Sequence, residues 1–360
     1  MLKKLIKRIS LMLLGTGLII NSAFFSISTS ANTFANGADI GWLNQLENNG
    51  VKWQDTNGQR KDALQILKNH GINSVRLRVF VNPPSNFVWT KNDGSKCLLG
   101  YGDTKGVVYM AQRAKNLGMK VMIDFHYSDH FADPAYQDKP AAWINDNFNQ
   151  LQKDVYSHTS YVMTALKNAG ITPDWVQVGN ETNSGMLWPD GNYRNFNKWA
   201  ALINQGYSAI KYVSPTSKVI IHLSSGANNS LYRSVFDGLT KAGAKFDVIG
   251  MSYYPYWDKV NYTQNINNLS YNLNDMASRY HKQVMICEIG GLENDSTNTY
   301  NMIKQVISKV KAVPGSNGLG VFYWEPEANS SVLPDAYPLG STSKVSNNVL
   351  RFTNAINAFN

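Results

Sequence analysis

The amino-acid sequence predicts a single (β/α)8 barrel, also called a TIM barrel. Four times along the chain, a helical pattern with lysine near its end stops at a glycine, and an apolar, β-branched strand follows within a few residues. A helix that ends where a strand begins, repeated in this way, is typical of a parallel sheet built from βα units. The glycines that end these helices are Gly71, Gly118, Gly170 and Gly243.

Eight apolar segments are expected to be the barrel strands, the number that closes such a barrel. They are residues 37–42, 73–80, 119–126, 174–180, 217–224, 246–254, 282–288 and 318–325. An open, doubly wound sheet is the alternative, but it would normally carry a glycine-rich phosphate loop after its first strand, and GADIGWLNQL contains none. No linker or low-complexity tract divides the chain, so one domain is expected over residues 36–360.

The composition fits a globular protein, because 43% of the 360 residues are hydrophobic and 16% are charged. The formal net charge of +9 raises the question of a nucleic-acid or membrane partner. Four of the basic residues lie within residues 1–35, which contain no acidic residue, and this leaves +5 on the remainder. The remaining basic residues are scattered and show no zinc-ligand spacing, so no nucleic-acid partner is expected.

Residues 1–35 have the pattern of a secretory signal peptide. A basic start is followed by a ten-residue apolar run, LMLLGTGLII, and then by small and polar residues. A membrane anchor is the alternative, but a span needs roughly 20 apolar residues. Cleavage is expected after Ala31 or Ala35. The mature protein is expected to be extracellular, monomeric and not attached to a membrane.

The two cysteines, Cys97 and Cys287, could form one disulfide in a secreted chain. Two free thiols are the favoured interpretation, because Cys287 lies in the apolar strand pattern VMICE and a domain of this size does not depend on one disulfide.

Alternation along the strands predicts which side chains enter the barrel. Arg76 and Arg78 should point inward, because two arginines cannot comfortably face an apolar helix layer. The same alternation turns Ile286 and Glu288 inward and Cys287 outward. Polar and aromatic groups therefore gather at the strand ends, where barrel active sites lie: Arg76, Arg78, Asp124, His126, Asn180, Glu181, His222, Tyr253, Tyr254, Glu288, Trp324 and Glu325.

Two carboxylates stand out, because Glu181 closes the fourth strand and Glu288 the seventh. A facing pair of carboxyl groups serves glycosidic-bond cleavage, in which one protonates the leaving oxygen and the other attacks or activates water. Arg76 could keep one of them ionised. The alternative is that both glutamates belong to a structural ion-pair network. The sequence has no serine nucleophile elbow and no HExxH motif, so serine-hydrolase and zinc-protease chemistry have no support.

Aromatic residues near the strand ends favour a sugar ligand. Trp188, Tyr256, Trp257 and Trp324 follow different strands. Each alone could be a packing residue. Together they provide flat apolar faces beside polar groups, which suit a pyranose ring.

Long motifs resemble family 53 of the glycoside hydrolases, the endo-β-1,4-galactanases. They are SVRLRVFVNPP, VMIDFHYSDHFADP, VQVGNETNSGMLWPDG, VIGMSYYPYW and GVFYWEPE, and the resemblance runs from about Ala38 to Pro326. It implies a barrel fold and a secreted, retaining endo-hydrolase of arabinogalactan side chains of pectin. It also implies that the partner is a polysaccharide and that no cofactor is required.

The resemblance also implies roles for particular residues. Glu181 matches the acid/base and Glu288 the nucleophile. Asn180 is implied to hydrogen-bond the 2-hydroxyl of the reacting sugar. Further substrate-binding residues are expected to be Arg76 and Tyr254, which match residues that contact the nucleophile, His126 and Trp324, which match positions around the attacked sugar, and the aromatic candidates Trp188 and Trp257.

The chain departs from the family pattern at the walls of the expected cleft. His130 and Phe131 replace the usual Thr-Trp, Ser224 removes a carboxylate, and WEPEA stands for WEPAW. Bacterial relatives often bind calcium after the seventh strand, where this chain offers only Glu293, Asn294 and Asp295, so calcium is doubtful. Two alternatives stay open: the same mechanism on another β-linked polysaccharide such as a mannan or glucan, and a catalytically silent barrel that binds polysaccharide.

Overall fold

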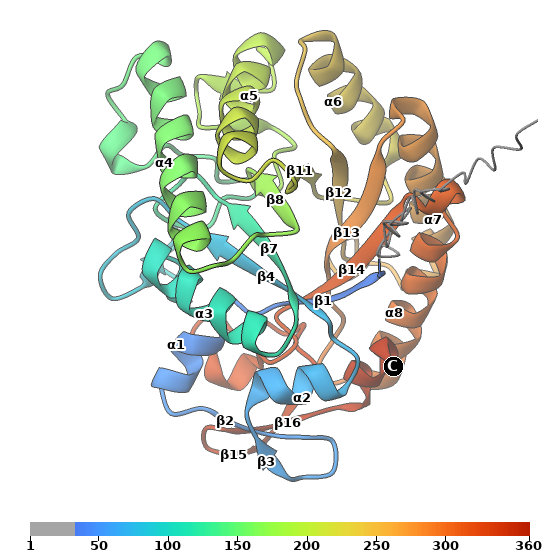
Figure 1. Ribbon diagram of the computed structural model, residues 1–360. Helices are drawn as coiled ribbons and strands as arrows, with labels where there is room; N and C mark the ends of the chain where they lie inside the picture. Colours follow the sequence, from blue (N-terminus) through green and yellow to red (C-terminus); the bar gives the residue numbers. More distant parts are fainter. Residues whose placement is uncertain (1–32) are drawn as a thin grey trace, which may run out of the picture. The chain divides into compact units, whose positions relative to one another are not determined.

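The structure is a computed structural model that describes residues 33–360. Its centre is a closed barrel of eight parallel strands, which confirms the predicted (β/α)8 fold (Figure 1). Each predicted strand segment overlaps one barrel strand. The strands are β1 Ala35–Asp39, β4 Ser74–Val79, β7 Lys120–Phe125, β8 Trp175–Val178, β11 Lys218–Leu223, β12 Val248–Tyr253, β13 Gln283–Ile289 and β14 Gly318–Trp324.

Eight α-helices of the described chain surround the barrel (Figure 1). They are α1 Leu43–Asn48, α2 Ala63–Asn69, α3 Thr104–Asn116, α4 Phe148–Asn168, α5 Phe196–Val213, α6 Asn229–Lys241, α7 Tyr262–Tyr280 and α8 Ser296–Lys311. Asp or Asn side chains accept a backbone N–H at the start of every helix except α1, which stabilises the helix ends. The glycines predicted to end helices have positive φ angles, as expected for that position: Gly71, Gly118, Gly170 and Gly243.

Short strands outside the barrel form three small separate sheets. Hairpin β5 Val88–Thr90 with β6 Lys96–Leu98 follows β4, and β9 Gly185–Met186 pairs with β10 Gly191–Asn192 after β8. A separate four-stranded sheet joins β2 Lys52–Gln54 and β3 Arg60–Lys61 to β15 Thr342–Ser346 and β16 Val349–Phe352. Four short 3-10 helices complete the described chain: η1 Ala141–Trp143, η2 Pro314–Ser316, η3 Ser330–Val332 and η4 Asn354–Phe359.

The end of the chain packs beneath the first strand. The Asn36 side chain in β1 donates a hydrogen bond to the carbonyl oxygen of Phe359 at 3.0 Å, and η4 packs against α8. A Cβ on Gly71 would lie 2.6 Å from that same carbonyl oxygen. The C-terminus therefore lies at the amino ends of β1 and β4, on the opposite face from their carboxyl ends.

Of the predicted signal segment, residues 1–35, residues 1–32 lie outside the described residues. Of the two expected cleavage points, Ala35 is the first residue of β1 and is fully buried. Among residues 33–360, no helix is both long enough and apolar enough to cross a membrane.

Two apolar clusters hold the barrel together. The larger one packs the outer strand faces against the helices. The smaller one fills the barrel interior and contains strand residues, with Trp175 and Phe322 as its largest members and Ala35 at one end. The indole of Trp175 and the ring of Phe322 meet edge to face, with centroids 6.1 Å apart. Both cysteines are buried and free, as predicted.

Gly37 is required by this interior packing. A Cβ at this position would lie 2.1 Å from the Phe322 ring, far inside contact distance. We expect Gly37→Ala to lower the free energy of unfolding by about 1–3 kcal/mol, measured by urea denaturation, because the packed interior must shift. The double variant Gly37→Ala/Phe322→Leu is expected to lose less than the sum of the single variants. A Gly37→Ala protein as stable as the parent would contradict this account.

Candidate functional site

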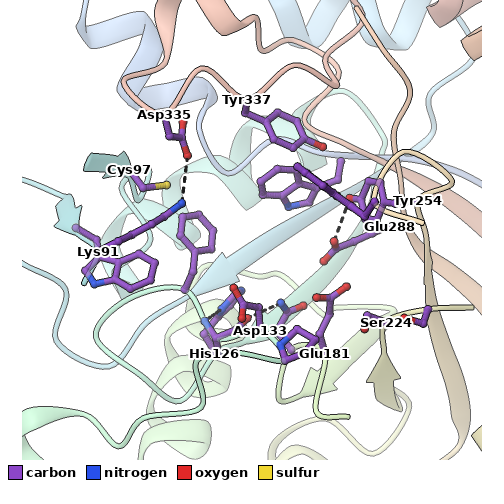
Figure 2. A pocket seen from close by; sticks show the side chains of 18 of the residues that line it. Lys91, Cys97, His126, Asp133, Glu181, Ser224, Tyr254, Glu288, Asp335 and Tyr337 are labelled. Atoms are coloured by element: carbon purple, nitrogen blue, oxygen red, sulfur yellow. Dashed lines mark hydrogen bonds and ion pairs between the residues drawn. The ribbon is translucent and has the colours of Figure 1, made fainter. Parts of the chain in front are cut away.

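A cavity of about 480 Å³ opens at the carboxyl ends of the barrel strands (Figure 2). This size is usual for a small-molecule site, and this face of the fold is where barrel enzymes hold their active sites. Every barrel strand, or the loop that follows it, supplies part of the lining, with these representatives in chain order: Trp42, Trp89, Phe131, Glu181, Ser224, Tyr254, Glu288 and Trp324.

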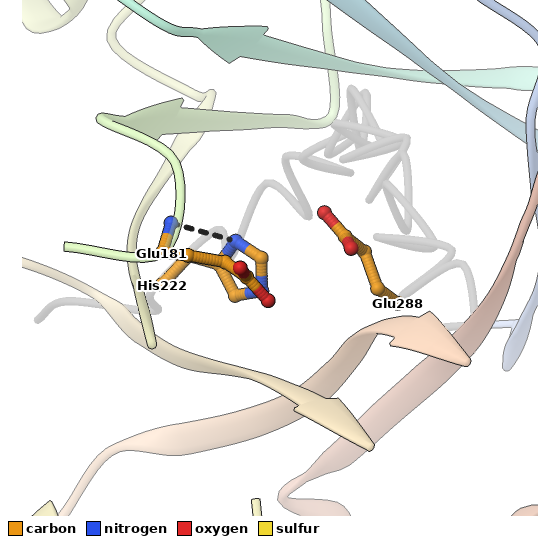
Figure 3. A group of neighbouring side chains, drawn as sticks. All are labelled: Glu181, His222 and Glu288. Atoms are coloured by element: carbon orange, nitrogen blue, oxygen red, sulfur yellow. Dashed lines mark hydrogen bonds between the residues drawn. The ribbon is translucent and has the colours of Figure 1, made fainter. Parts of the chain in front are cut away.

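Glu181 and Glu288 face each other across this cavity. One carboxylate oxygen of each, together with a ring nitrogen of His222, lie within 4.8 Å of one another (Figure 3). Glu181 comes three residues after β8, where positive φ angles at Gly179 (89°) and Glu181 (43°) turn the chain. A non-glycine residue held at such an angle is costly and is often found at functional sites. The two carboxylates are thus close enough to act on one glycosidic bond.

A β-bulge in β13 gives Glu288 its inward direction. Met251 of β12 pairs with Ile286, but the next residue, Ser252, pairs with Glu288, so one extra residue is inserted. Cys287 therefore joins the barrel interior and Ile286 packs in the outer core. The predicted directions of Cys287 and Ile286 were wrong, because simple alternation does not hold across a bulge. Glu288 nevertheless faces inward as predicted.

Arg76 links the nucleophile candidate to the barrel floor. Its guanidinium lies 2.9 Å from Glu288 Oε1, 2.7 Å from Asp39 Oδ2 and 2.9 Å from Asp124 Oδ2. Its Nε also donates to Gln177 Oε1 at 2.7 Å. The Arg76 side chain is 1% exposed, so this cation and its three carboxylates are almost removed from water.

Different neighbours separate the proton affinities of the two buried glutamates. Burial and the nearby Glu288 charge raise the pKa of Glu181 well above its ordinary value. Burial also raises the pKa of Glu288, but the Arg76 guanidinium and a hydrogen bond from Tyr254 Oη, 3.1 Å long, oppose that rise. Glu181 is therefore the proton-holding member of the pair, and Glu288 is the member that keeps its negative charge.

Asn180 is fixed beside the pair. Its Oδ1 accepts from Arg76 at 2.8 Å and lies 3.0 Å from His222 Nδ1, while its Nδ2 donates to the Ala132 carbonyl at 2.7 Å. An amide nitrogen carries two hydrogens, so one N–H is left for a ligand in the cavity that Asn180 lines. His222 Nε2 lies 2.8 Å from Ser252 Oγ, so both of its ring nitrogens have partners.

His126 and Trp324 also line the cavity. His126 Nε2 lies 2.9 Å from Asp124 Oδ2, and its Nδ1 accepts from the Ala132 N–H at 2.8 Å. Burial lowers the pKa of His126 in spite of Asp124. The Trp324 ring meets Trp42 at 4.8 Å between centroids and stays half-buried, so one part of the ring faces the cavity.

Trp257 and Trp188 lie differently. Trp257 lines the cavity and is 57% exposed, at its rim. Trp188 does not line this cavity; its indole Nε1 donates to the Ser184 carbonyl at 3.0 Å. The substrate-binding roles of both residues stay predictions.

Other charged residues at the strand ends form a structural ion-pair network, the role that was the alternative for Glu181 and Glu288. The Arg78 guanidinium bonds Glu325 and lies 3.3 Å from Asp39 Oδ1. Glu325 also accepts from the Trp42 N–H at 3.0 Å. All three ionisable side chains are at most 2% exposed. Arg78 and Glu325 therefore act in the wall of the barrel, and Arg76 is the arginine that reaches Glu288.

The departures from the family pattern change the cavity wall. Phe131 lines the cavity beneath the Arg78 guanidinium, which lies 4.8 Å from its ring centroid. His130 does not line the cavity but stacks on Trp89, with centroids 4.3 Å apart. Ser224 lines the cavity and accepts a hydrogen bond from Asn183 Nδ2 at 2.8 Å.

The residues suggested for calcium already use their carboxylates elsewhere. Glu293 accepts from the N–H and the hydroxyl of Ser330, and Asp295 accepts from the Asn298 N–H at the start of α8. Within residues 33–360, the grouping of His, Cys, Asp and Glu that could hold a metal is Glu181, His222 and Glu288. Because both His222 nitrogens have partners, this group fits acid/base chemistry better than metal binding. Calcium binding near Glu293, Asn294 and Asp295 stays a prediction.

The sequence-based prediction missed several residues of the site. Gln177 follows the same inward alternation as Trp175 and could have been found from it. Ser252 lies in β12 opposite Glu288 and gave no signal as a lone serine. Trp89 lies in the three-residue hairpin strand β5 and Tyr337 in the loop after η3, segments too short or too irregular to show a periodic pattern.

Comparisons with known proteins agree with this geometry. The chain matches the family described as glycosyl hydrolase family 53 over residues 35–292 and 289–359. An arabinogalactan endo-β-1,4-galactanase of Humicola insolens is 33% identical over 313 residues, covering 81% of this chain and 88% of that protein. A probable arabinogalactan endo-β-1,4-galactanase A of Neosartorya fischeri is 33% identical over 321 residues, covering 82% of this chain and 85% of that protein. The solved structure of a fungal β-1,4-galactanase matches with a TM-score of 0.78 and 29% identity, covering 91% of this chain and 98% of that protein.

Two independent lines thus meet at the same strand ends. The paired carboxylates provide glycosidase chemistry, and the family match extends over nearly all of the described barrel. The chain belongs to glycosyl hydrolase family 53 and is a glycosidase.

Proposed function

We propose that this protein is a secreted, retaining endo-β-1,4-galactanase that cleaves galactan side chains of pectin. The observation that carries the mechanism is the close approach of the Glu181 and Glu288 carboxylates, with one oxygen of each within 4.8 Å. A retaining enzyme needs its carboxyl groups about 5–5.5 Å apart, whereas an inverting enzyme needs room for a water between them. The substrate follows from the relatives, whose names state β-1,4-galactanase activity.

The reaction proceeds in two displacements. Glu288 attacks the anomeric carbon while Glu181 gives its proton to the leaving oxygen, so the glycosidic bond breaks and a galactosyl ester forms on Glu288. Glu181, now ionised, then takes a proton from water, and that water attacks the anomeric carbon and releases Glu288. The free Asn180 N–H is placed to hold the 2-hydroxyl of the reacting sugar. No residue in this sequence of steps calls for a cofactor.

A substrate panel tests the proposed activity. Purified protein is incubated with linear β-1,4-galactan, mannan and β-glucan, and new reducing ends are counted. Release from galactan alone supports the proposal. Cleavage of mannan or glucan instead would favour the second candidate function, the same mechanism on another β-linked polysaccharide. The residues that differ from the family pattern near the cavity, Phe131, His130 and Ser224, are the reason to test it. NMR of early products is expected to show the β-anomer first, and initial α-anomer would overturn the retaining mechanism.

The pH profile should be bell-shaped. Activity on galactan is expected to fall at low pH as Glu288 gains a proton, and at high pH as Glu181 loses the proton that it must donate. Because the pKa of Glu181 is raised, the alkaline limb is expected well above the ordinary carboxyl range. Glu181→Gln should lose that limb when kcat/KM is measured on an aryl galactoside with a good leaving group, which needs no acid. An unchanged alkaline limb in this variant would assign the limb to another group.

For export, cleavage after Ala31 is the better candidate of the two predicted points. Cleavage after Ala35 would remove the first residue of β1, which pairs with Gly320 of β14. N-terminal sequencing of the protein from culture medium decides between them. Size-exclusion chromatography tests the expected monomer.

A further inference from the structure

Two loops that carry no predicted site residue form one side of the cavity. The β5–β6 hairpin supplies Trp89 and Lys91, and the segment that follows η3 supplies Asp335 and Tyr337. Both loops line the same cavity as Glu181 and Glu288. The second loop belongs to the region after β14 in which the chain leaves the family pattern.

The Trp89 ring is held rigidly with one side toward the cavity. His130 stacks on it at 4.3 Å with planes 1° apart, and Tyr136 meets it edge to face at 5.0 Å. Trp89 lines the cavity whereas His130 and Tyr136 do not. His130 therefore covers one face of the indole, and a ligand can contact the part of the ring that lines the cavity, next to Lys91. A ring already fixed by its neighbours loses little conformational freedom when a sugar stacks on it.

Lys91 and Asp335 hold unused hydrogen-bonding capacity beside this ring. Lys91 Nζ is 5.9 Å from the Trp89 ring centroid and 3.8 Å from Asp335 Oδ2, which is longer than a hydrogen bond. Asp335 Oδ1 is buried and has no conventional hydrogen-bond partner, and the Cys97 thiol beside this carboxylate is only a weak donor. A sugar hydroxyl both donates and accepts, so it fits between an ammonium and a carboxylate at this spacing.

The position of these groups indicates which part of a polysaccharide they meet. Figure 2 shows Ser224 beside Glu181, while Lys91 and Asp335 lie on the other side of the cavity. Glu181 protonates the leaving oxygen, so its side of the cavity holds the leaving part of the chain. The Tyr337 ring contacts Trp324, with centroids 4.7 Å apart, and Trp324 is expected beside the attacked sugar. The two loops therefore lie next to the attacked sugar, on the side away from the leaving part of the chain.

We propose that Trp89, Lys91 and Asp335 form a sugar subsite that binds a galactosyl residue on the nonreducing side of the attacked sugar. The indole stacks on the apolar face of the pyranose, and the ammonium and carboxylate hold two of its hydroxyls. The Lys91–Asp335 pair also joins the two loops, so this subsite sets how the enzyme favours polymer over a single galactoside. The inference rests on the proposed function, from which it takes the identity of the sugar.

Binding of β-1,4-galactotetraose to an inactive parent protein, Glu288→Gln, tests the subsite by calorimetry. Trp89→Ala in that background is expected to weaken tetraose binding about 5–10-fold, because a ring-stacking contact is lost. Trp89→Phe should retain most of the affinity. Tyr212→Ala removes a surface aromatic ring that is 78% exposed on α5, and this control should leave binding unchanged.

Kinetics separate a binding role from a structural one. In the otherwise native enzyme, Trp89→Ala and Lys91→Met should raise KM for galactan with little change in kcat. Neither should change kcat/KM for a single-sugar aryl β-galactoside more than about twofold, since that substrate does not reach the subsite. Asp335→Asn combined with Lys91→Met should cost less than the sum of the single variants.

Each failure has a separate meaning. Absence of tetraose binding by the Glu288→Gln parent would overturn the proposed substrate and this subsite with it. Parent binding that Trp89→Ala leaves intact would overturn the subsite alone. An equal loss on tetraose, galactan and aryl galactoside would also overturn it, because Trp89 would then support the fold rather than one sugar.

Discussion

Glu288→Ala is expected to reduce kcat on galactan by on the order of 10⁴-fold or more, because the covalent step loses its nucleophile. Glu181→Ala should lose about 10²–10⁴-fold on galactan, whose leaving oxygen needs a proton. The second variant should keep far more activity on an aryl galactoside with a good leaving group. Reducing-end and aryl-release assays on the same preparations measure this difference.

Added azide distinguishes the two roles further. Azide can enter the space left by the Glu288 side chain and give an α-galactosyl azide, whereas in Glu181→Ala it attacks the ester on Glu288 and gives the β-product. Glu47→Ala is a matched control, because Glu47 lies on α1 and pairs with Arg113 away from the cavity. Swapped azide products would reverse the assignments. Full activity in either glutamate variant would show that the pair was wrongly chosen.

Arg76→Met is expected to lower the free energy of unfolding by about 3–5 kcal/mol at pH 7, since it leaves buried carboxylates without their cation. This network is almost completely buried, since the Arg76 side chain is 1% exposed and the Asp124 side chain is fully buried. Arg113→Met is the control, because Arg113 pairs near the surface with Glu47 and Asp62, whose side chains are 28% and 48% exposed, so its loss should cost about 1 kcal/mol or less. Urea unfolding at pH 7 measures both.

The dependence on pH has a definite sign. Burial alone would raise the pKa of Asp124, but the nearby charges, Arg76 foremost, lower it from 3.8 to about 2 in the folded protein. A lowered carboxyl pKa stabilises the fold above its ordinary value, and this contribution is lost as pH falls from about 4 to about 2. The gap between wild type and Arg76→Met should therefore be widest at neutral pH and narrower at pH 3. A gap that widens on acidification would contradict the ion-pair account.

The same substitution should also affect catalysis. Burial raises the pKa of Glu288, and without the guanidinium this rise loses its main opposing charge, so the acidic limb of the pH profile should move upward. Arg76→Lys keeps a positive charge but loses the fork that reaches several oxygens at once, and it should lie between wild type and Arg76→Met. An unmoved acidic limb in a folded Arg76→Met protein would mean that Arg76 has no electrostatic role at Glu288.

Local patterns predicted the barrel and the positions of its two facing glutamates, because each depends on a few neighbouring residues. Glycine after a helix and β-branched residues in the next segment define a βα unit without reference to the rest of the chain. Glu181 and Glu288 end such strands, so their meeting at one face follows from the closure of a parallel barrel.

Other features depend on contacts between segments far apart in sequence. The bulge at Cys287 arises from the register between β12 and β13, and no local pattern reports that register. Lys91, in the turn of the β5–β6 hairpin, meets Asp335, in the loop after η3, although the two residues are 244 positions apart in the sequence. Such loops have no period, so the walls of the cavity could be predicted far less well than its floor.

The placement of the chain ends has a practical consequence. Ala35 begins β1 and Phe359 packs beneath it, so both ends of the described domain leave from the face opposite the catalytic cavity. A tag, a binding module or a solid support joined at either end would therefore leave the mouth of the barrel turned toward the medium. An immobilised form of this enzyme should keep its access to long, insoluble chains whichever end is tethered.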